Sequence, residues 1–329
     1  MKIALFNTKM YDKQFFDIAI ANTDHTIEYF EVSLNSATAK LTPGYDAVCV
    51  FVNDYLQADT LEQLAKHGIR LILLRCAGFN NVDIEKAHTL GIRIYRVPAY
   101  SPQAVAEHAV ALLLTLNRKT HKAFNRVREH NFSLERLTGF DVYKKTIGIV
   151  GTGQIGIAFS KIMKGFGCNV LAYDIVQSQE ALSQGVQYVD FDTLLAQSDI
   201  ISLHCPLNHA TKHMLNMTQF EKMKQGVMII NTSRGGLIHT IDAIQALKTG
   251  KIGYLGIDVY EQEEHLFFKD LSESIVADDV IARLMTFPNV LITAHQGFFT
   301  NEALEQIAQT TIQNIDLYIS NTHTENEVI

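Results

Sequence analysis

Short apolar runs alternate with amphipathic stretches along this chain, and the alternation occurs in two successive blocks. In the first block, helical patterns such as Leu56–His67 and Asp83–Leu90 separate runs that have the length of strands. The strand-like runs are Lys2–Phe6, Ile27–Val32, Ala47–Val52, Arg70–Cys76 and Arg93–Val97. This alternation predicts a parallel sheet covered by helices.

A second block of the same kind begins at Ile147. Its later strand-like runs are Val170–Tyr173, Ile200–Cys205, Val227–Asn231, Leu255–Val259 and Val290–Thr293. We therefore predict an α/β protein with two Rossmann-like or flavodoxin-like parallel-sheet domains and an active-site cleft between them.

Two long helical segments are expected where the blocks join. Ser101 followed by Pro102 is a favourable helix start, so a helix is predicted over Gln103–Lys119. The apolar spacing over Asn301–Ser320 predicts an amphipathic helix that returns to the first domain. The predicted domains are a substrate domain, residues 1–100 plus 300–329, and a cofactor domain, residues 101–299.

Length, composition and charge narrow the class of protein. A chain of 329 residues suits two domains, and 47% hydrophobic with 19% charged residues is ordinary for a globular protein. The net charge of −7 would attract neither nucleic acid nor an anionic membrane. No apolar stretch approaches the ~18 residues of a membrane span. The four cysteines are far apart and form no C-x-x-C pair, so we expect reduced thiols in a cytoplasmic protein.

A glycine-rich turn lies between the first strand-like run of the second block and a helical stretch. Its glycines permit a tight turn and close backbone approach to a pyrophosphate at the helix N-terminus. Asp174, at the end of the next run, suits the ribose hydroxyls and repels a 2′-phosphate, so NAD is favoured over NADP. An ordinary flexible turn is the alternative. The cofactor-binding residues predicted from this pattern are Gly151, Gly153, Gln154, Ile155, Gly156 and Asp174.

Ligands of parallel sheets bind beyond the carboxyl ends of the strands. At three such ends the second block carries Arg234 in a glycine-rich turn, Glu263 in a carboxylate run and His295. Each of these alone is also compatible with a loop charge, a solvated face or a structural histidine. Together they are the set that hydride transfer to a 2-keto acid requires. The guanidinium fixes the carboxylate, the histidine donates a proton, and the glutamate orients the histidine.

Several motifs resemble the D-isomer-specific 2-hydroxyacid dehydrogenases, and the resemblance covers essentially the whole chain. The motifs are Gly151–Gly156, Asn231–Gly235, Gly256–Glu263 and Thr286–His295, and the stretches His265–Leu271 and Asp278–Leu284 are similar to the lactate-forming members. The resemblance implies Arg234 as the clamp for the substrate carboxylate, His295 as the acid/base and Glu263 as its partner.

The same resemblance implies substrate contacts in the first domain. The segment Arg75–Asp83 is similar to a family loop whose backbone N–H groups, here at Ala77 and Gly78, meet the substrate carboxylate. Tyr100 matches a substrate-contacting tyrosine, with packing as the alternative. Phe51 is a candidate contact for the substrate methyl group. A core phenylalanine is an equally good interpretation of this position.

Further cofactor contacts are expected at strand ends of the second domain. They are Cys205, Pro206, Thr232 and Asp258. A core position is the alternative for Cys205, and the resemblance implies Asp258 as a support for the site. No metal is expected, because the neighbouring His204, His209 and His213 lack a carboxylate or cysteine that would complete a ligand set.

The expected function is the reversible, NADH-dependent reduction of pyruvate to D-lactate. One alternative is a dehydrogenase for a larger 2-keto acid, since a methylene is worth only ~1–3 kcal/mol of discrimination. Another is an NAD-sensing binding protein, which the set of Arg234, Glu263 and His295 disfavours. The helix Gln103–Lys119 is apolar around more than one face, which predicts a homodimer or higher homo-oligomer, with tight burial between the domains as the alternative.

Overall fold

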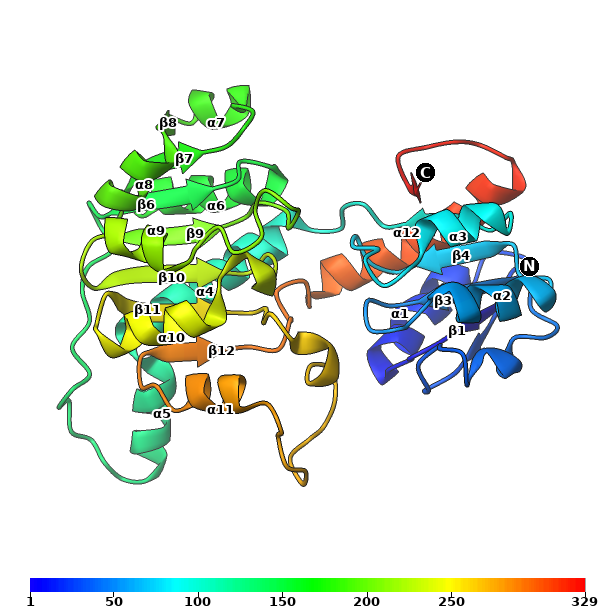
Figure 1. Cartoon of the computed structure of the whole chain (residues 1–329), viewed down its shortest axis with the longest axis horizontal. Coiled ribbons are helices and arrows are strands. Elements are labelled where there is room, and N and C mark those ends of the chain that lie inside the picture. The colour runs from blue at the N-terminus through cyan, green and yellow to red at the C-terminus, as the bar shows by residue number, and fades with distance from the viewer. Residues whose placement is uncertain (329) are drawn as a thin grey trace. The chain divides into compact units, whose positions relative to one another are not determined.

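The structure is a computed structural model that describes residues 1–328. The chain forms two compact units (Figure 1). Unit 1 contains Met1–Ser101 and the chain from Phe299 onward, and unit 2 contains Pro102–Phe298. Unit 2 is therefore an insertion between two segments of unit 1.

Unit 1 is built on a sheet that has, among the described residues, six strands in the order β13-β5-β4-β3-β1-β2. The strands are β1 (Lys2–Leu5), β2 (Thr26–Tyr29), β3 (Ala47–Val50), β4 (Leu71–Leu74), β5 (Arg93–Arg96) and β13 (Glu327–Val328). Strands β1 to β5 are parallel, and β13 pairs antiparallel with β5 at the edge. The central strands β3 and β4 are buried along their whole length, as expected for a sheet covered on both faces.

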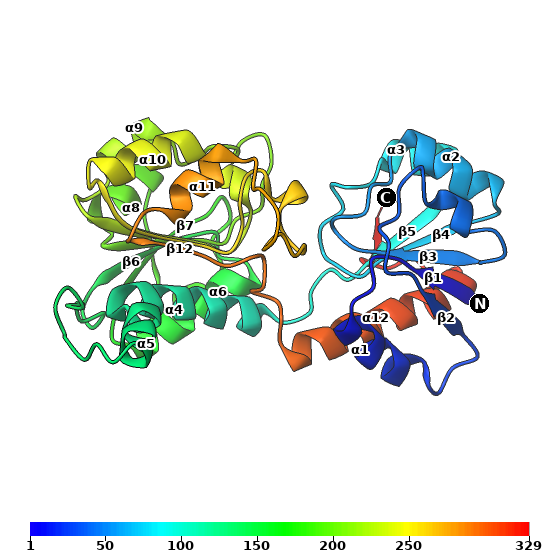
Figure 2. The ribbon, with the colours of Figure 1, turned by 90° about the horizontal axis from the view of Figure 1, so that it is seen from below.

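Helices cover both faces of the unit 1 sheet (Figure 2). One face carries α2 (Ala58–Lys66) and α3 (Ile84–Thr89), with the short 3-10 helix η1 (Ala39–Leu41) beside α2. The other face carries α1 (Met10–Ile20) and α12 (Asn301–Ile319), which pack against each other. Thr300 caps α12 by accepting a hydrogen bond from the backbone N of Ala303. The apolar stripe of α12 thus completes the core of unit 1.

Unit 2 has a parallel sheet whose described strands number seven, in the order β12-β11-β10-β9-β6-β7-β8. The strands are β6 (Thr146–Val150), β7 (Asn169–Tyr173), β8 (Gln187–Tyr188), β9 (Ile200–Leu203), β10 (Val227–Asn231), β11 (Ile252–Ile257) and β12 (Val290–Ile292). The chain builds outward from β6 to β8, then returns to the other side of β6 with β9. The strand order therefore reverses between β6 and β9, which is where doubly wound sheets bind ligands.

Helices also cover both faces of the unit 2 sheet (Figure 2). One face carries α4 (Pro102–Arg118), α5 (Thr120–Arg128) and α6 (Gln154–Gly165). The opposite face carries α8 (Phe191–Gln197), α9 (Met217–Lys222), α10 (Thr240–Lys248) and α11 (Asp279–Met285). The remaining short helices are α7 (Gln179–Ser183), η2 (Gly235–Leu237) and η3 (Glu263–His265).

The structure confirms the predicted α/β class and the two parallel-sheet domains. Several strands are shorter than predicted, because strand pairing stops where the chain turns into the loops at the carboxyl edge of each sheet. Strand β3 ends at Val50 and β9 at Leu203, so Phe51 and Cys205 lie in loops. The two-residue strands β8 and β13 were not predicted, because so short a segment shows no alternation.

Helix α4 is covered within the single chain. Leu112, Leu113 and Leu116 are buried, and the helix packs on α6, β10 and β11. Its exposed positions include Glu107 and Arg118, which are charged. These apolar residues are therefore buried within unit 2 itself, and an oligomer contact through this helix stays a prediction. Among the described residues, none of the helices has the length and apolar character needed to cross a membrane.

Candidate active site

The glycine-rich turn follows β6 at the point where the strand order of unit 2 reverses. Gly151 has a φ of +96°, and a Cβ on it would lie 2.6 Å from the backbone N of Cys205, in the loop after β9. A Cβ on Gly156 would lie 2.0 Å from the carbonyl oxygen of Gly151. Because both contacts are with backbone, neither position has room for a side chain. Gly156 lets α6 pack tightly against the end of β6, and Gly151 lets the turn approach the loop after β9.

Gly153 serves a different purpose. It is the N-cap residue of α6, and a Cβ on it would meet nothing within 4 Å. No side chain caps the helix, so the N–H groups of Gln154, Ile155 and Gly156 lack the partners that later helical residues have. Open space in front of three N–H donors and a positive helix end fits the pyrophosphate of NAD.

Asp174 lies just beyond β7 and is hydrogen-bonded to the glycine-rich turn. Its Oδ2 accepts hydrogen bonds from the backbone N of Thr152 at 2.6 Å and from its Oγ1 at 3.1 Å. Its Oδ1 accepts from the backbone N of Val176 at 3.3 Å, and the side chain is half-buried. A carboxylate has about four acceptor sites, so Asp174 keeps acceptor capacity for ribose hydroxyls.

Thr232 and Cys205 lie in adjacent loops, after β10 and β9. The Oγ1 atom of Thr232 is buried and has no hydrogen-bond partner within the described part of the chain, which suits a polar ligand group. The two loops are joined by Ser233, whose Oγ donates to the carbonyl oxygen of Cys205 at 2.7 Å. Burial raises the pKa of the Cys205 thiol to about 11. Cys205, with Pro206 beside it, therefore offers a packing surface rather than a nucleophile.

Arg234 lies in the turn between β10 and η2. The side-chain amide of Asn231 donates to the carbonyl oxygen of Arg234 at 2.9 Å, which holds the backbone of the turn. The half-buried guanidinium donates from Nη1 to the carbonyl oxygen of Ser233 at 2.7 Å. Since a guanidinium has five N–H donors, it retains donors for a ligand carboxylate.

His295 and Glu263 are brought together from strand ends far apart in the sequence. Nδ1 of His295 lies 2.8 Å from Oε1 of Glu263, while Oε2 of Glu263 accepts from the backbone N of Tyr260 at 2.8 Å. Both side chains are about one-fifth exposed, at 21% and 22%. The carboxylate selects the tautomer with hydrogen on Nδ1 and orients the ring. Nε2 is then the ring nitrogen left to exchange a proton with a substrate.

Asp258 is enclosed behind the loop that carries His295. Its carboxylate accepts from Oγ1 of Thr293 at 2.5 Å and from the backbone N of Gln296 and Gly297 at 2.9 and 2.7 Å. Burial works to raise the pKa of Asp258, but hydrogen bonds from His108, Thr293 and Gln296 outweigh it and lower the pKa. The structure gives Asp258 a supporting position, and a direct cofactor contact stays a prediction.

The candidate substrate residues of unit 1 lie in loops after its strands. Ala77 and Gly78 follow β4, and their carbonyl oxygens accept from Nη1 of Arg96 at 3.0 Å and Sγ of Cys76 at 3.2 Å. Phe51 follows β3 and Tyr100 follows β5; both side chains are half-buried. All four are thus at the carboxyl edge of the unit 1 sheet.

The fold also reveals polar pairs that the sequence analysis missed. Glu261, which belongs to the same carboxylate run as Glu263, has its Oε1 2.5 Å from Nε2 of His213. Arg75 is buried, and its Nε donates to Oδ1 of Asp12 at 3.2 Å. His108 lies on the apolar helix α4 beside Asp258. No local sequence signal reveals such pairs, because their partners are distant along the chain.

The three histidines considered for a metal site have separate surroundings. The half-buried His204 has its Nε2 beside Oγ of Ser202, and desolvation of the ring lowers its pKa to about 3. His213 instead pairs with Glu261. In the part of the chain that the structure describes, no three histidine, cysteine or acidic side chains gather as potential metal ligands.

Comparison with known proteins identifies the family. Residues 110–297 match the family model described as D-isomer specific 2-hydroxyacid dehydrogenase, NAD binding domain. The D-lactate dehydrogenase of Escherichia coli (strain K12) is 52% identical over 329 residues, which is 100% of each chain. The chain belongs to the D-isomer specific 2-hydroxyacid dehydrogenase family. As a member of this family it is an NAD-dependent oxidoreductase, and unit 2 is its NAD-binding domain.

Solved structures give the same 2-hydroxyacid dehydrogenase fold. The apo-structure of D-lactate dehydrogenase from Escherichia coli superposes with a TM-score of 0.92 at 50% identity and covers 100% of both chains. The pyruvate reductase of Chlamydomonas reinhardtii superposes with a TM-score of 0.94 at 44% identity, covering 99% of this chain and 98% of its own. The predicted family and cofactor are thereby confirmed.

Proposed function

We propose that this 2-hydroxyacid dehydrogenase reduces pyruvate to D-lactate with NADH. The observation that carries the proposal is the pairing of His295 with Glu263 at 2.8 Å, on the same sheet edge that supports the Arg234 turn. The names of the similar D-lactate dehydrogenase and pyruvate reductase agree with it. An NAD sensor would need no oriented acid/base, so the pair favours catalysis over sensing.

Each proposed residue has a distinct task. Arg234 binds the keto-acid carboxylate through the donors that Ser233 leaves unused, and the backbone of Ala77 and Gly78 supplies further N–H donors. Phe51 and Tyr100 contact the rest of the substrate, with Phe51 limiting the size of its side chain. These contacts present one face of the carbonyl, which sets the configuration of the product as D.

The proton for the new hydroxyl comes from His295. Glu263 holds Nδ1, so Nε2 faces the substrate and donates its proton to the keto oxygen as that oxygen gains negative charge. Bound NADH supplies the hydride for the keto carbon. In the reverse direction Nε2 accepts the hydroxyl proton. The net reaction converts pyruvate, NADH and a proton to D-lactate and NAD⁺.

The proposed NAD site is formed by the N-terminus of α6 and by the loops after β7, β9 and β10. The N–H groups of Gln154 and Ile155, in front of the open space at Gly153, bind the pyrophosphate, and Asp174 binds the ribose hydroxyls. Thr232, through its unpartnered Oγ1, and the Cys205–Pro206 loop contact the remainder. Asp258 keeps the His295 loop in place from behind.

The test is NADH oxidation measured with pyruvate, 2-ketobutyrate, 2-ketoisocaproate, phenylpyruvate and hydroxypyruvate, followed by chiral analysis of the product. We expect the highest kcat/KM with pyruvate and D-lactate as the product. A higher kcat/KM with a bulkier acid would retain the reaction and change the substrate. NADH binding without turnover of any of the five would refute the proposal and favour a sensor.

We also propose a cytoplasmic homodimer. The four cysteines are free thiols, which agrees with a reducing compartment. Large apolar side chains are exposed on α5 and in the segment after it, including Phe124 at 61%, Phe132 at 72% and Leu134 at 82%. Large apolar side chains that are exposed within one short stretch of chain are candidates for contact with a second copy. Light scattering on wild type and on Phe132→Ser/Leu134→Ser tests this, with dissociation expected in the variant and an unchanged mass contradicting it.

A further inference from the structure

Two of the three glutamates in the segment after β11 pair with a histidine, each from a different loop. Glu263 pairs with His295 and belongs to the proposed catalytic set. Glu261 pairs with His213, which lies in the loop between β9 and α9, at 2.5 Å between Oε1 and Nε2. The pair of Glu261 and His213 takes no part in the proposed proton transfer. Its role at this end of the sheet is therefore a separate question.

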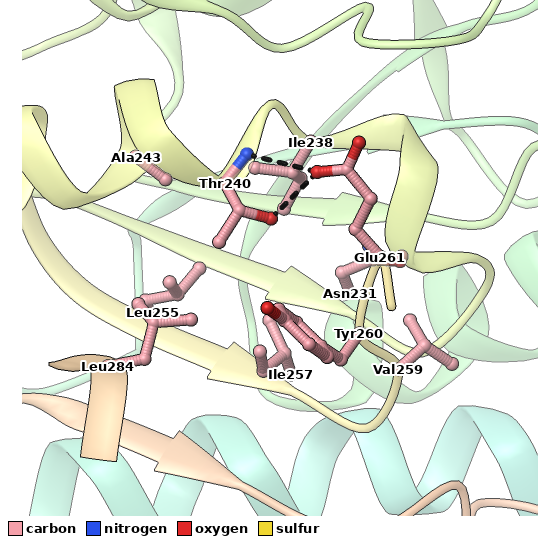
Figure 3. Close-up of a pocket in the computed structure, with 11 residues that line it drawn as sticks. Asn231, Ile238, Thr240, Ala243, Leu255, Ile257, Val259, Tyr260, Glu261 and Leu284 are labelled. Carbon is pink, nitrogen blue, oxygen red and sulfur yellow. Dashed lines mark hydrogen bonds between the residues drawn. The ribbon is translucent and has the colours of Figure 1, made fainter. Parts of the chain in front are cut away.

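Glu261 also binds the start of α10. Its Oε2 accepts from Oγ1 of Thr240 at 3.0 Å and lies 3.5 Å from the backbone N of the same residue (Figure 3). Burial works to raise the pKa of Glu261, but the hydrogen bonds from His213 and Thr240 outweigh it and lower the pKa. The carboxylate therefore joins two segments, the β9–α9 loop and the first turn of α10, to the turn that also carries Glu263.

These segments surround the Arg234 turn. On one side, the backbone N of His213 donates to the carbonyl oxygen of Gly236 at 2.8 Å. On the other, a Cβ on Gly235 would lie 2.1 Å from the carbonyl carbon of Tyr260, so the turn lies directly against the backbone beside Glu261. The pair of Glu261 and His213 closes around the residues that follow Arg234.

The pair is poorly placed to contribute much to stability. The side chains of His213 and Glu261 are 30% and 26% exposed, and partly exposed ion pairs contribute little to the free energy of unfolding. Binding a carboxylate with a planar guanidinium, in contrast, depends strongly on direction. A small shift of the Arg234 turn therefore affects substrate binding more than folding.

We propose that Glu261 and His213 are positioning residues, which hold the Arg234 turn so that its guanidinium faces the carboxylate of a 2-keto acid. This inference rests on the proposed role of Arg234 in substrate binding. It assigns the pair no contact with substrate or cofactor. Its consequence is that the pair controls affinity for the keto acid and leaves affinity for NADH unchanged.

The test measures binding of oxamate, a non-reducible 2-keto acid analogue, to the NADH complex, together with the KM for pyruvate. In Glu261→Ala and His213→Gln we expect both constants to rise about tenfold, since small misplacements of a binding group are costly. We expect a smaller fall in kcat and an unchanged Kd for NADH. Glu261→Gln, which keeps an oxygen for Thr240, should restore part of the affinity.

Glu264→Ala is the matched control, because Glu264 lies in the same segment and is exposed. It should leave all constants unchanged. Repeating Glu261→Ala in an Arg234→Lys background shows whether Glu261 acts through Arg234, in which case its effect shrinks to less than about twofold. An undiminished effect there, or unchanged oxamate affinity in Glu261→Ala, overturns the inference.

The outcomes separate this inference from the proposed function. If wild type binds oxamate in a Glu261-dependent manner but does not reduce pyruvate, the proposed reaction fails and the positioning role stands. If wild type reduces pyruvate and Glu261→Ala binds oxamate as wild type does, the positioning role fails alone. If wild type does not bind oxamate at all, both are overturned.

Discussion

Nδ1 of His295 lies 2.8 Å from Oε1 of Glu263, and the two residues come from the turns after β12 and β11. His295 has a φ of +53°, a conformation that few residues other than glycine adopt. Its backbone N donates to the carbonyl oxygen of Asp258 at 2.7 Å, which holds this conformation. The surrounding structure therefore dictates where the imidazole lies, as an acid/base requires.

Removing the acid/base should abolish most turnover without affecting the cofactor site. For His295→Gln we expect kcat to fall roughly 10²–10⁴-fold, the range attributed to general acid–base catalysis. Glu263→Gln should give a smaller loss, because the ring keeps a hydrogen-bond partner for Nδ1 but loses the stronger, charge-assisted bond that orients it. NADH titration should give wild-type affinity in both. A variant with kcat close to wild type would remove that residue from the mechanism.

Two glycines of one turn should respond in opposite ways to alanine. Gly156→Ala places a Cβ against the carbonyl oxygen of Gly151, and overpacking of this kind costs about 1–3 kcal/mol in the free energy of unfolding. Gly153→Ala meets only open space, so folding should change little while the added methyl group obstructs the pyrophosphate and weakens NADH binding. Thermal unfolding and NADH titration check both. Equal behaviour of the two variants would contradict this division of roles.

Asp174 should decide between NADH and NADPH. Replacing it with alanine removes a negative charge that repels the 2′-phosphate and an acceptor for the ribose, so activity with NADH falls and activity with NADPH rises. We expect the ratio of kcat/KM values to shift at least about tenfold, since like charges near a protein surface repel by a few kcal/mol. Asp192→Ala, an exposed carboxylate of α8 paired with Lys222, is the control. An unmoved ratio would exclude Asp174 from the ribose site.

Phe51 should set the size of the accepted substrate. Its ring lies 4.8 Å from the guanidinium carbon of Arg75, which restricts its movement. Phe51→Ala should increase kcat/KM for 2-ketoisocaproate relative to pyruvate by about 10–200-fold, the value of ~1–3 kcal/mol of apolar contact. If the variant only loses stability and keeps its preference, Phe51 belongs to the core alone.

Acid should weaken the C-terminal strand. A hydrogen bond from Arg93, at 2.6 Å, is the main cause that lowers the pKa of Glu327, and burial opposes it. A lowered pKa means that Glu327 stabilises the fold above its unfolded value of about 4.3 and loses this contribution as pH falls through the folded pKa. Glu327→Gln should therefore lower Tm by about 2–4 °C at pH 7. The difference from wild type should shrink as pH falls below about 4.3 and vanish once pH lies below the lowered folded pKa of Glu327. A difference that is independent of pH would contradict the ionic origin.

The sequence by itself determined the elements, the family and the cofactor. Alternation of apolar runs and helical patterns reflects local periodicity, which is why the strands near Ile147, Val227 and Val290 were predicted close to their observed places. The glycine-rich turn could also be predicted from the sequence, because its glycines have a characteristic local spacing and Gly156 is required by a backbone contact with Gly151 within one βαβ unit.

Only the tertiary structure decided how polar side chains are paired. By residue pattern Glu261, Glu263 and Glu264 form one carboxylate run, in which only the family resemblance singled out Glu263 as the partner of His295. In the fold Glu263 does pair with His295, whereas Glu261 pairs with His213 and Glu264 is exposed. Tertiary packing likewise decided which apolar residues of α4 are buried within unit 2. The physical reason is that periodicity is a property of neighbouring residues, whereas a hydrogen bond between side chains depends on which strand ends the sheet order places side by side.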